Sequence, residues 1–501
     1  MDLSGNHGNP HLAVVLPEIL AKIATFLPKS DLLSCTLINS TWETEVRKLL
    51  FDNVRIVLTP EKIFSHKKIV PSPPFRGSSI GFFSFASHLS GHGPCANYVR
   101  NHGAIVKTIT TSFFIKAEAF TLPKDLELVA KSFPNATTLE LDVNFWSLGS
   151  TYESLIFPPP KRYSFSKVKT LEIATSTRIH NLLGNDNLTY CTQLGAIFAK
   201  IIPRLVPLLP NVEALSFFNS AQTVVENFLD LFSATVTTLK MSGVTITAPM
   251  QRPTILNLTR LEIGCYYLDK SNFSHVLKFA SETLQHVKFS EVENVPVNDK
   301  YSTRYAIVFP VMRKLRVFEL VQNKFTDRSA YKNSLVRPKL ILRWEGGRGH
   351  SGTRLVYQDQ FPVLETVRIS RNETHHLLRN RGIEDRLTEQ EYFEASVTFL
   401  YETFLREGNS RSESVKRLDV PFPPEAKFRL EKCEGGNGEC YEWRDSSEFW
   451  DRAVEMFPNL VKYAAIGESR ERMRAAGVKE WVKLGEKLGF VRGKERKGSR
   501  I

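Results

Sequence analysis

The amino-acid sequence predicts a mixed α/β protein in which a short helical module precedes a long body built on a parallel sheet. Helical spacing of apolar residues is dense between residues 12 and 58, and a nine-residue phrase typical of a buried strand then recurs along residues 105–467. Several stretches between the phrases have helical spacing again. The chain has 501 residues, which is long enough for several domains or for one elongated array of repeats.

The first predicted helix begins close to residue 16. Its apolar residues fall at i, i+3, i+4, i+7 and i+11, on one stripe: Leu16, Ile19, Leu20, Ile23 and Leu27. Pro17 suits the first helical position, where its missing N–H is not needed and its fixed φ angle favours the helix. Pro28 is expected to end the helix, because proline disfavours the α conformation in the residue before it.

Two further helices are expected before residue 58. Ser30 or Asp31 caps the second, which carries four apolar residues, Leu32, Leu33, Leu37 and Ile38. The third begins with a Ser-x-x-Glu capping box, in which Ser40 accepts an N-terminal amide and Glu43 reaches back to the serine N–H. Its inner face carries Trp42, Val46, Leu49 and Leu50. Three helices of this length hide little apolar surface, so the module is expected to need a partner.

Residues 12–58 resemble the F-box. The match follows the order Leu-Pro, Glu-Ile-Leu, an apolar-Leu-Pro turn, Asp-Leu-Leu and a lone Trp before a closing Leu-Leu-aromatic. The resemblance implies that the module binds the Skp adaptor of a cullin–RING ubiquitin ligase. It implies a docking set of Leu16, Pro17, Ile19, Leu20, Ile23, Leu27, Leu32, Leu33, Leu37, Ile38 and Trp42. The alternative is a generic three-helix cap that buries these leucines against the body.

The body is predicted from one recurring phrase. An aromatic residue or leucine, often followed by Pro, precedes an apolar residue, two polar residues, Leu or Val, a polar residue and a final apolar residue. The clear copies are FPNATTLEL at Phe133, FSKVKTLEI at Phe165, LPNVEALSF at Leu209, FPVMRKLRV at Phe309 and FPVLETVRI at Phe361. Looser copies reach Leu239, Leu261, Val287 and Leu418, and FPNLVKYAA at Phe457 ends the series. The endings alternate with period 2, which indicates strands whose intervening Glu, Lys or Arg side chains face water.

The spacing of these phrases is similar to that of leucine-rich repeats. The anchors Leu215, Leu239, Leu261, Val287 and Leu315 are separated by 24, 22, 26 and 28 residues, within the range of about 20 to 29 for such repeats. Residues 194–205, 273–284 and 389–405 have helical spacing between phrases. Wider gaps imply insertions, and only Asn144 and Asn372 match the asparagine of the repeat pattern. We therefore expect an irregular solenoid with a parallel sheet; an unrelated α/β fold is the alternative.

Two segments outside the module and the body have distinct composition. Residues 59–104 are rich in Pro, Gly, Ser and His and are expected to form a linker or long loop. Residues 468–501 form a basic tail, in which residues 469–501 contain eleven Lys or Arg against four Glu, over half of the chain's formal charge of +13. We interpret this basic tail as a solvated end rather than as a nucleic-acid site.

Composition also predicts the compartment. The first residues lack a basic segment followed by an apolar run, and no apolar run approaches the roughly 18 to 20 residues that cross a bilayer. The six cysteines are scattered, which favours a reducing environment. We therefore expect a cytoplasmic or nuclear protein that does not enter a membrane.

The sequence contains only weak matches to catalytic and metal-binding motifs. Gly347 to Gly352 match G-x-G-x-x-G, but residues 353–357 alternate like a strand, which favours a hairpin loop over a phosphate site. Cys433 and Cys440 lack further zinc ligands nearby and indicate a turn, and the His375-His376 pair belongs to no metal-binding pattern. The sequence therefore predicts no enzyme and no cofactor.

The predicted function is that of a substrate-recognition adaptor of an SCF-type (Skp–cullin–F-box) ubiquitin ligase. The module would dock on the Skp adaptor, and the body would bind a protein target whose identity the sequence does not give. The alternative is a leucine-rich scaffold outside any ligase, with a basic tail attracted to nucleic acid or an anionic surface.

Overall fold

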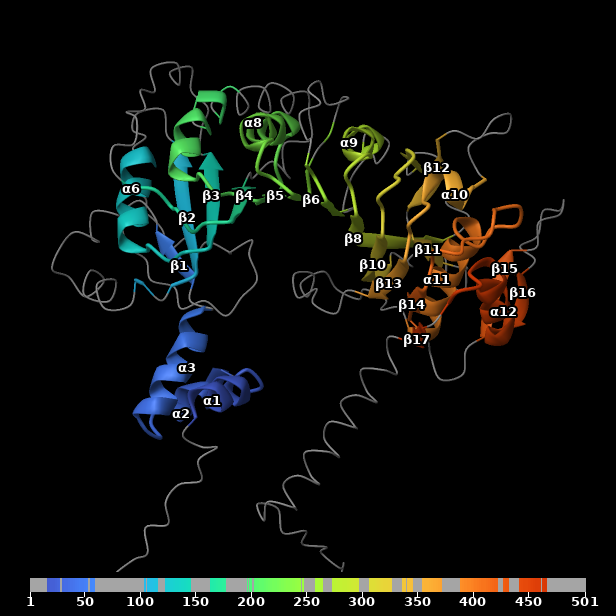
Figure 1. Cartoon of the computed structure of the whole chain (residues 1–501), viewed down its shortest axis with the longest axis horizontal. Coiled ribbons are helices and arrows are strands. Elements are labelled where there is room, and N and C mark those ends of the chain that lie inside the picture. The colour runs from blue at the N-terminus through green and yellow to red at the C-terminus, as the bar shows by residue number, and fades with distance from the viewer. Residues whose placement is uncertain are drawn as a thin grey trace, which may run out of the picture. The chain divides into compact units, whose positions relative to one another are not determined.

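The computed structural model describes the chain in segments (Figure 1). The described residues are 16–27, 29–52, 55–58, 103–104, 106–115, 122–145, 163–176, 196, 198–200, 202–244, 246, 257–264, 273–296, 306–326, 336–338, 340–345, 354–371, 388–421, 427–431, 441–460 and 462–465. They divide into two compact units, Met1–Asn257 and Leu258–Ile501, and each unit is described by itself. Most of residues 59–104 and all of residues 468–501 lie outside the described part, as do Asn372, His375, His376, Cys433 and Cys440.

Three helices open unit 1: α1 (Pro17–Ala24), α2 (Lys29–Cys35) and α3 (Ser40–Asp52). Pro17 occupies the first turn of α1, as predicted. The helix ends at Ala24, before it reaches Pro28, and the Thr25 hydroxyl donates to the Lys22 carbonyl at 2.7 Å. We call α1, α2 and α3 the three-helix module.

The second and third helices differ in detail from the prediction. The second was expected to include Leu37 and Ile38, but α2 ends at Cys35 and these residues form the turn that follows it. The third was expected to be capped by Ser40. Instead, the Asn39 side-chain oxygen accepts the backbone N–H of Trp42 at 2.9 Å, so that Asn39 is the cap and Ser40 is already helical.

The three-helix module has a small core of its own. The core consists of Leu20 and Ala24 from α1 and Trp42 and Val46 from α3. Ile23, Leu27, Leu32 and Cys35 pack against it and are partly buried. The predicted apolar stripe of α1 therefore faces α3 over only part of its length.

The rest of unit 1 is a parallel sheet in which each strand pairs with the next along the chain. Its strands are β1 (Arg55–Leu58), β2 (Thr108–Ile115), β3 (Thr138–Phe145), β4 (Thr170–Ser176), β5 (Ala214–Phe218) and β6 (Thr238–Ser242). Helices α6 (Leu122–Ser132) and α8 (Gln222–Phe232) and the 3-10 helix η5 (Val206–Leu208) lie between strands in sequence. Residues 55–58, within the range assigned to the helical module, thus belong to this sheet.

The repeated leucine of the phrase builds the core of unit 1. One buried row crosses four strands in register: Leu139, Leu171, Leu215 and Leu239. Phe217, two residues after Leu215, contacts Phe228 of α8 with ring centroids 5.7 Å apart. The period-2 ending therefore points one set of side chains from the sheet to the helices, as expected for a strand with one buried face.

Unit 2 contains a second set of parallel strands: β7 (Arg260–Gly264), β8 (His286–Pro296), β10 (Val317–Thr326), β13 (Thr366–Arg371), β14 (Arg417–Val420) and β17 (Lys462–Ala465). Each pairs in parallel with the next in this order. A short strand, β11 (Val336–Pro338), runs antiparallel to β8. The predicted class, mixed α/β with a large parallel sheet, is confirmed.

The described part of unit 2 contains two further strand pairs, which were not predicted, and four helices. The strands β9 (Ala306–Phe309) and β12 (Ile341–Trp344) form a parallel pair, and β15 (Lys427–Glu431) and β16 (Tyr441–Asp445) form an antiparallel hairpin. The helices are α9 (Phe273–Ala280), α10 (Tyr357–Gln360), α11 (Glu389–Glu402) and α12 (Ser446–Met456). Both α9 and α11 confirm helices predicted between phrases.

One repeat copy was placed three residues too early. Phe309 belongs to β9, and the copy begins at Met312, whose carbonyl accepts the Leu315 N–H as Phe361 does for Leu364. Phe318, not Leu315, therefore takes the anchor position, in register with Val287 and Val367. Phe309 and Pro310 match the first two positions of the phrase, although they do not begin a copy of it. The other copies lie on strands as predicted.

The prediction of a hairpin loop around Gly347 to Gly352 is wrong. Residues 354–356 form no strand, and helix α10 begins at Tyr357. The preceding strand β12 pairs in parallel with β9 rather than with a returning strand. The alternation of residues 353–357 reflects the buried side chains of Leu355 and Tyr357 and not extended pairing.

Candidate docking surfaces

The three-helix module exposes several large apolar side chains. Leu37 is 87% exposed, Phe26 is 74% exposed and Ile38 is 56% exposed, and all three lie in the turns that join the helices. Leu16 and Ile19 at the start of α1 are also exposed. Single exposed apolar residues are ordinary on protein surfaces, but this many within one small module indicate an interaction surface.

The predicted docking residues therefore separate into three groups. Those exposed to solvent are Leu16, Pro17, Ile19, Leu37 and Ile38. Those partly buried against the module core are Ile23, Leu27 and Leu32, and those inside it are Leu20 and Trp42. The side chain of Leu33 lies outside the described residues. The exposed group is the most accessible to a partner in this conformation, and the core group positions it.

Phe26 is a candidate that the sequence reasoning missed. It falls at i+7 from Ile19 and i+3 from Ile23, at the edge of the predicted stripe, but it was not included in the docking set. The available signal was its place: a large aromatic residue in the turn just before Pro28, where no helix face can bury it.

A second candidate surface is a row of charged side chains on the sheet of unit 2. Neighbouring strands place residues of alternating charge side by side: Glu262, Lys288, Glu319, Arg368 and Asp419. These residues alternate with the buried anchors, so they share the face opposite the core. We call this set the charged row.

Close polar contacts connect the first half of the charged row. Lys288 Nζ lies 3.6 Å from Glu262, and His286 Nε2 lies 3.3 Å from Glu319. The contact with His286 holds the pKa of Glu319 below its ordinary value, and the positive charges of Lys288 and Arg368 act in the same direction. Burial of the Glu319 carboxylate opposes this shift. The Glu319 carboxylate is therefore stabilised in its charged form.

Two arginines converge on one carboxylate at the other end of the charged row. Asp419 accepts hydrogen bonds from Arg417 Nε at 2.9 Å and from Arg368 Nε at 3.1 Å. The Asp419 side chain is only 1% exposed. The bond to Asp419 raises the pKa of Arg417 and so favours its charged form.

The prediction that polar residues within the strands face water holds only in part. In unit 1, Glu140 and Asp142 of β3 are buried, and the Thr110 hydroxyl on β2 donates to Glu140. Neighbouring strands lie about 4.8 Å apart, so long side chains cover one another across the sheet. The polar face is therefore a packed, hydrogen-bonded surface.

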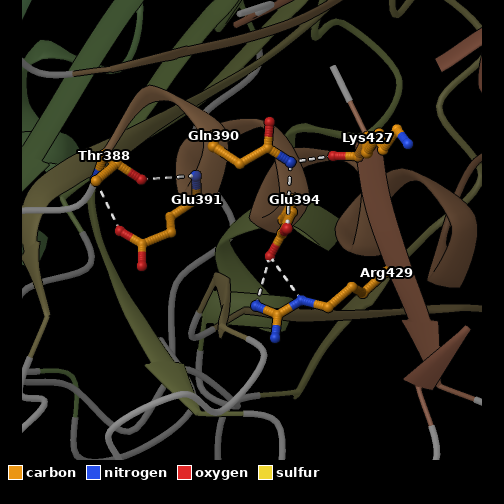
Figure 2. A network of polar contacts seen from close by, with 6 residues as sticks. All are labelled: Thr388, Gln390, Glu391, Glu394, Lys427 and Arg429. Atoms are coloured by element: carbon orange, nitrogen blue, oxygen red, sulfur yellow. Dashed lines mark hydrogen bonds and ion pairs between the residues drawn. The ribbon is translucent and has the colours of Figure 1, made fainter. Parts of the chain in front are cut away.

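The hairpin of β15 and β16 is tied to α11 by a polar network (Figure 2). The buried Glu394 carboxylate accepts from Arg429 Nη2 at 2.7 Å and from Gln390 Nε2 at 3.2 Å, and Gln390 also donates to the Lys427 carbonyl. One turn earlier, Thr388 and Glu391 form the capping box that begins α11. The capping box therefore fixes the start of the helix, and the contacts of Gln390 and Glu394 hold the hairpin against it.

Arg429 also holds an exposed aromatic side chain. Its guanidinium lies over the ring of Trp443, 5.2 Å from the ring centroid, and Trp443 is 59% exposed. The two residues are directly opposite each other in the hairpin. Trp443 is thus an exposed aromatic residue with a fixed orientation.

Two comparisons with known proteins found no match for this chain. No protein-family model matches the sequence, and no curated protein matches it.

No helix in the described part of the chain is long and apolar enough to cross a membrane. Among the same residues, His, Cys, Asp and Glu side chains form no group of three or more that could hold a metal ion.

Proposed function

We propose that this chain is a substrate-recruiting adaptor of an SCF-type ubiquitin ligase, in which the three-helix module acts as an F-box and the repeat body holds a protein target. The observation that carries the proposal is that the module has both a small core of its own and a set of exposed apolar side chains. A small core fixes the three helices, while Leu37, Phe26 and Ile38 project from the turns.

The energetics of the module support a docking role. Burying one large apolar side chain contributes about 1.5–3 kcal/mol, so several exposed ones leave substantial binding energy unused in the free protein. Leu16, Ile19 and Pro17 add to the exposed set at the start of α1. A partner with a complementary apolar groove would bury these side chains without disturbing Leu20 or Trp42.

The body supports the second half of the proposal. Parallel strands recur with an apolar-x-apolar ending, and their buried anchors stay in register across each unit. This arrangement resembles irregular leucine-rich repeats, which present an extended polar face to a partner. The charged row is the described feature of that face with the most specific chemistry.

A pull-down with a purified Skp adaptor tests the proposal. Phe26→Ala and Leu37→Ala remove two exposed side chains, and Leu231→Ala on α8 is the matched control, an exposed leucine outside the module. Truncating two anchors at an interface commonly costs about 2–4 kcal/mol, or roughly 30-fold or more in affinity.

We expect wild type and the Leu231→Ala control to retain the Skp adaptor, and the double variant to lose it with an unchanged melting temperature. Equal capture by all three proteins would show that the exposed turns take no part. A fall in melting temperature of the double variant would instead assign Phe26 and Leu37 to structural contacts.

A further inference from the structure

Arg368 and Arg417 are held in place before any ligand binds. Arg368 lies on β13 directly opposite Asp419, and Arg417 lies two residues earlier than Asp419 on β14. Because the buried Asp419 carboxylate accepts from the Nε atom of each, the two guanidinium groups are oriented by one anchor. A ligand would not need to order them, which removes part of the usual entropic cost of binding.

Each arginine keeps an edge for a second acceptor. A guanidinium carries five N–H donors in a planar fork, and its Nη1–Nη2 edge can grip a carboxylate in a bidentate manner. The bonds to Asp419 use Nε. The side chains of Arg368 and Arg417 remain 34% and 46% exposed, so the remainder of each fork is accessible from solvent.

The charge around the pair selects the ligand. Two positive arginines against one negative Asp419 leave a single positive charge, which one carboxylate neutralises. On the other side of Arg368, the negative Glu319 limits how much negative charge the site tolerates.

We propose that Arg368 and Arg417 receive a carboxylate side chain, Asp or Glu, of a protein bound along the polar face of unit 2. The inference rests on the proposed role of the body as the target-binding part. Along the charged row, Glu262 and Glu319 would repel a phosphodiester chain, whose binding depends on many phosphate contacts. A peptide of mixed charge meets complementary groups on the same surface.

Conservative variants test the pair without unfolding it. Arg368→Lys and Arg417→Lys retain the charge beside Asp419, but a lysine ammonium has no fork for bidentate binding. Arg316→Lys is the matched control, because Arg316 is mostly exposed, belongs to the same unit and lies 4.0 Å from Glu365 rather than near Asp419.

The probes are three rhodamine-labelled heptapeptides of the form Gly-Lys-Gly-X-Gly-Lys-Gly, with Glu, Gln or phosphoserine at X. Binding to the full chain is measured by fluorescence anisotropy at low salt. We expect the Glu peptide to bind wild type and Arg316→Lys alike, and to bind each of the other two variants about tenfold more weakly. The Gln peptide should bind about as weakly to wild type as the Glu peptide binds to those variants.

Three results would overturn the inference: no binding of the Glu peptide to wild type, equal binding of the Glu and Gln peptides, or unchanged binding by Arg368→Lys and Arg417→Lys. Phosphoserine binding more than about tenfold tighter than Glu, and lost in both variants, would reassign the site to phosphate.

Capture of the Skp adaptor is measured in parallel and should be the same in all variants. Its absence from wild type, with peptide binding intact, would contradict the proposed function and leave the arginine site standing.

Discussion

The side-chain oxygen of Asn39 accepts the backbone N–H of Trp42 at 2.9 Å, and this bond sets the first residue of α3. Asn39 lies between residues with opposite environments. Trp42 belongs to the module core, whereas Leu37 and Ile38, just before the cap, are exposed. The cap thus separates the part of the module that packs inward from the part that faces outward.

Replacing Asn39 by Ala should loosen the start of α3. Loss of an N-cap commonly costs about 0.5–2 kcal/mol, and Asn39→Asp should restore most of it because aspartate accepts the same N–H. Hydrogen–deuterium exchange in the full chain measures the effect locally. We expect faster exchange in α3 for Asn39→Ala only. Equal protection in all three proteins would show that Ser40 can take over as the cap.

Trp42 offers a test of the module core. Its indole Nε1 is buried and finds no acceptor among the described residues. Trp42→Phe removes this donor while keeping an aromatic ring, so its cost should stay below that of a cavity. Trp42→Ala should lose about 3–5 kcal/mol. Hydrogen–deuterium exchange in α1 and α3 distinguishes the two variants. A comparable loss of protection in both would show that the indole N–H makes an essential contact.

Arg429→Ala should destabilise the hairpin of β15 and β16. It leaves the Glu394 carboxylate buried without its guanidinium, a change that commonly costs about 3–5 kcal/mol. Lys278→Ala is the control, since the pair of Lys278 and Glu345 is exposed and such pairs contribute at most about 1 kcal/mol. Thermal unfolding compares the two variants. A melting temperature of Arg429→Ala no lower than that of the control would contradict the role of the network in Figure 2.

The free energy of unfolding of unit 2 should fall at acid pH because Glu319 becomes protonated. The pKa of Glu319 is lowered in the folded protein, so its contribution is complete above the unfolded value of 4.5 and is lost as the pH falls through the lower folded value. Glu319→Gln should flatten this acid branch of a urea-unfolding series. Glu365→Gln, which removes a half-exposed carboxylate of the same unit, is the control. A Glu319→Gln curve parallel to wild type below pH 4.5 would contradict the assignment.

How far the sequence predicts the fold depends on the range of the interactions involved. The strand at Leu139 and its partners at Leu171 and Leu215 are predictable, because period-2 alternation is local and repeats along the chain. The anchor at Phe318 was missed because Phe309 and Pro310 satisfy the same local pattern three residues earlier. Only the pairing with neighbouring strands decides between the two.

The candidate sites show the same limit. Helical spacing identified Leu16 and Ile19, which are exposed, but it also included Leu20, which is buried, because periodicity does not say which part of a stripe a neighbouring helix covers. The arginine pair was not predictable from sequence. Arg368 and Asp419 are 51 residues apart, and only strand pairing brings them together.

The affinity of the purified full chain for a purified Skp adaptor tests the central proposal most directly. We expect wild type to bind at micromolar concentration or tighter, and Leu16→Ala with Pro17→Ala to bind at least about 30-fold more weakly with a near-unchanged melting temperature, because both side chains are exposed. Failure of the wild-type chain to bind any Skp adaptor at micromolar concentration would contradict the ligase function outright.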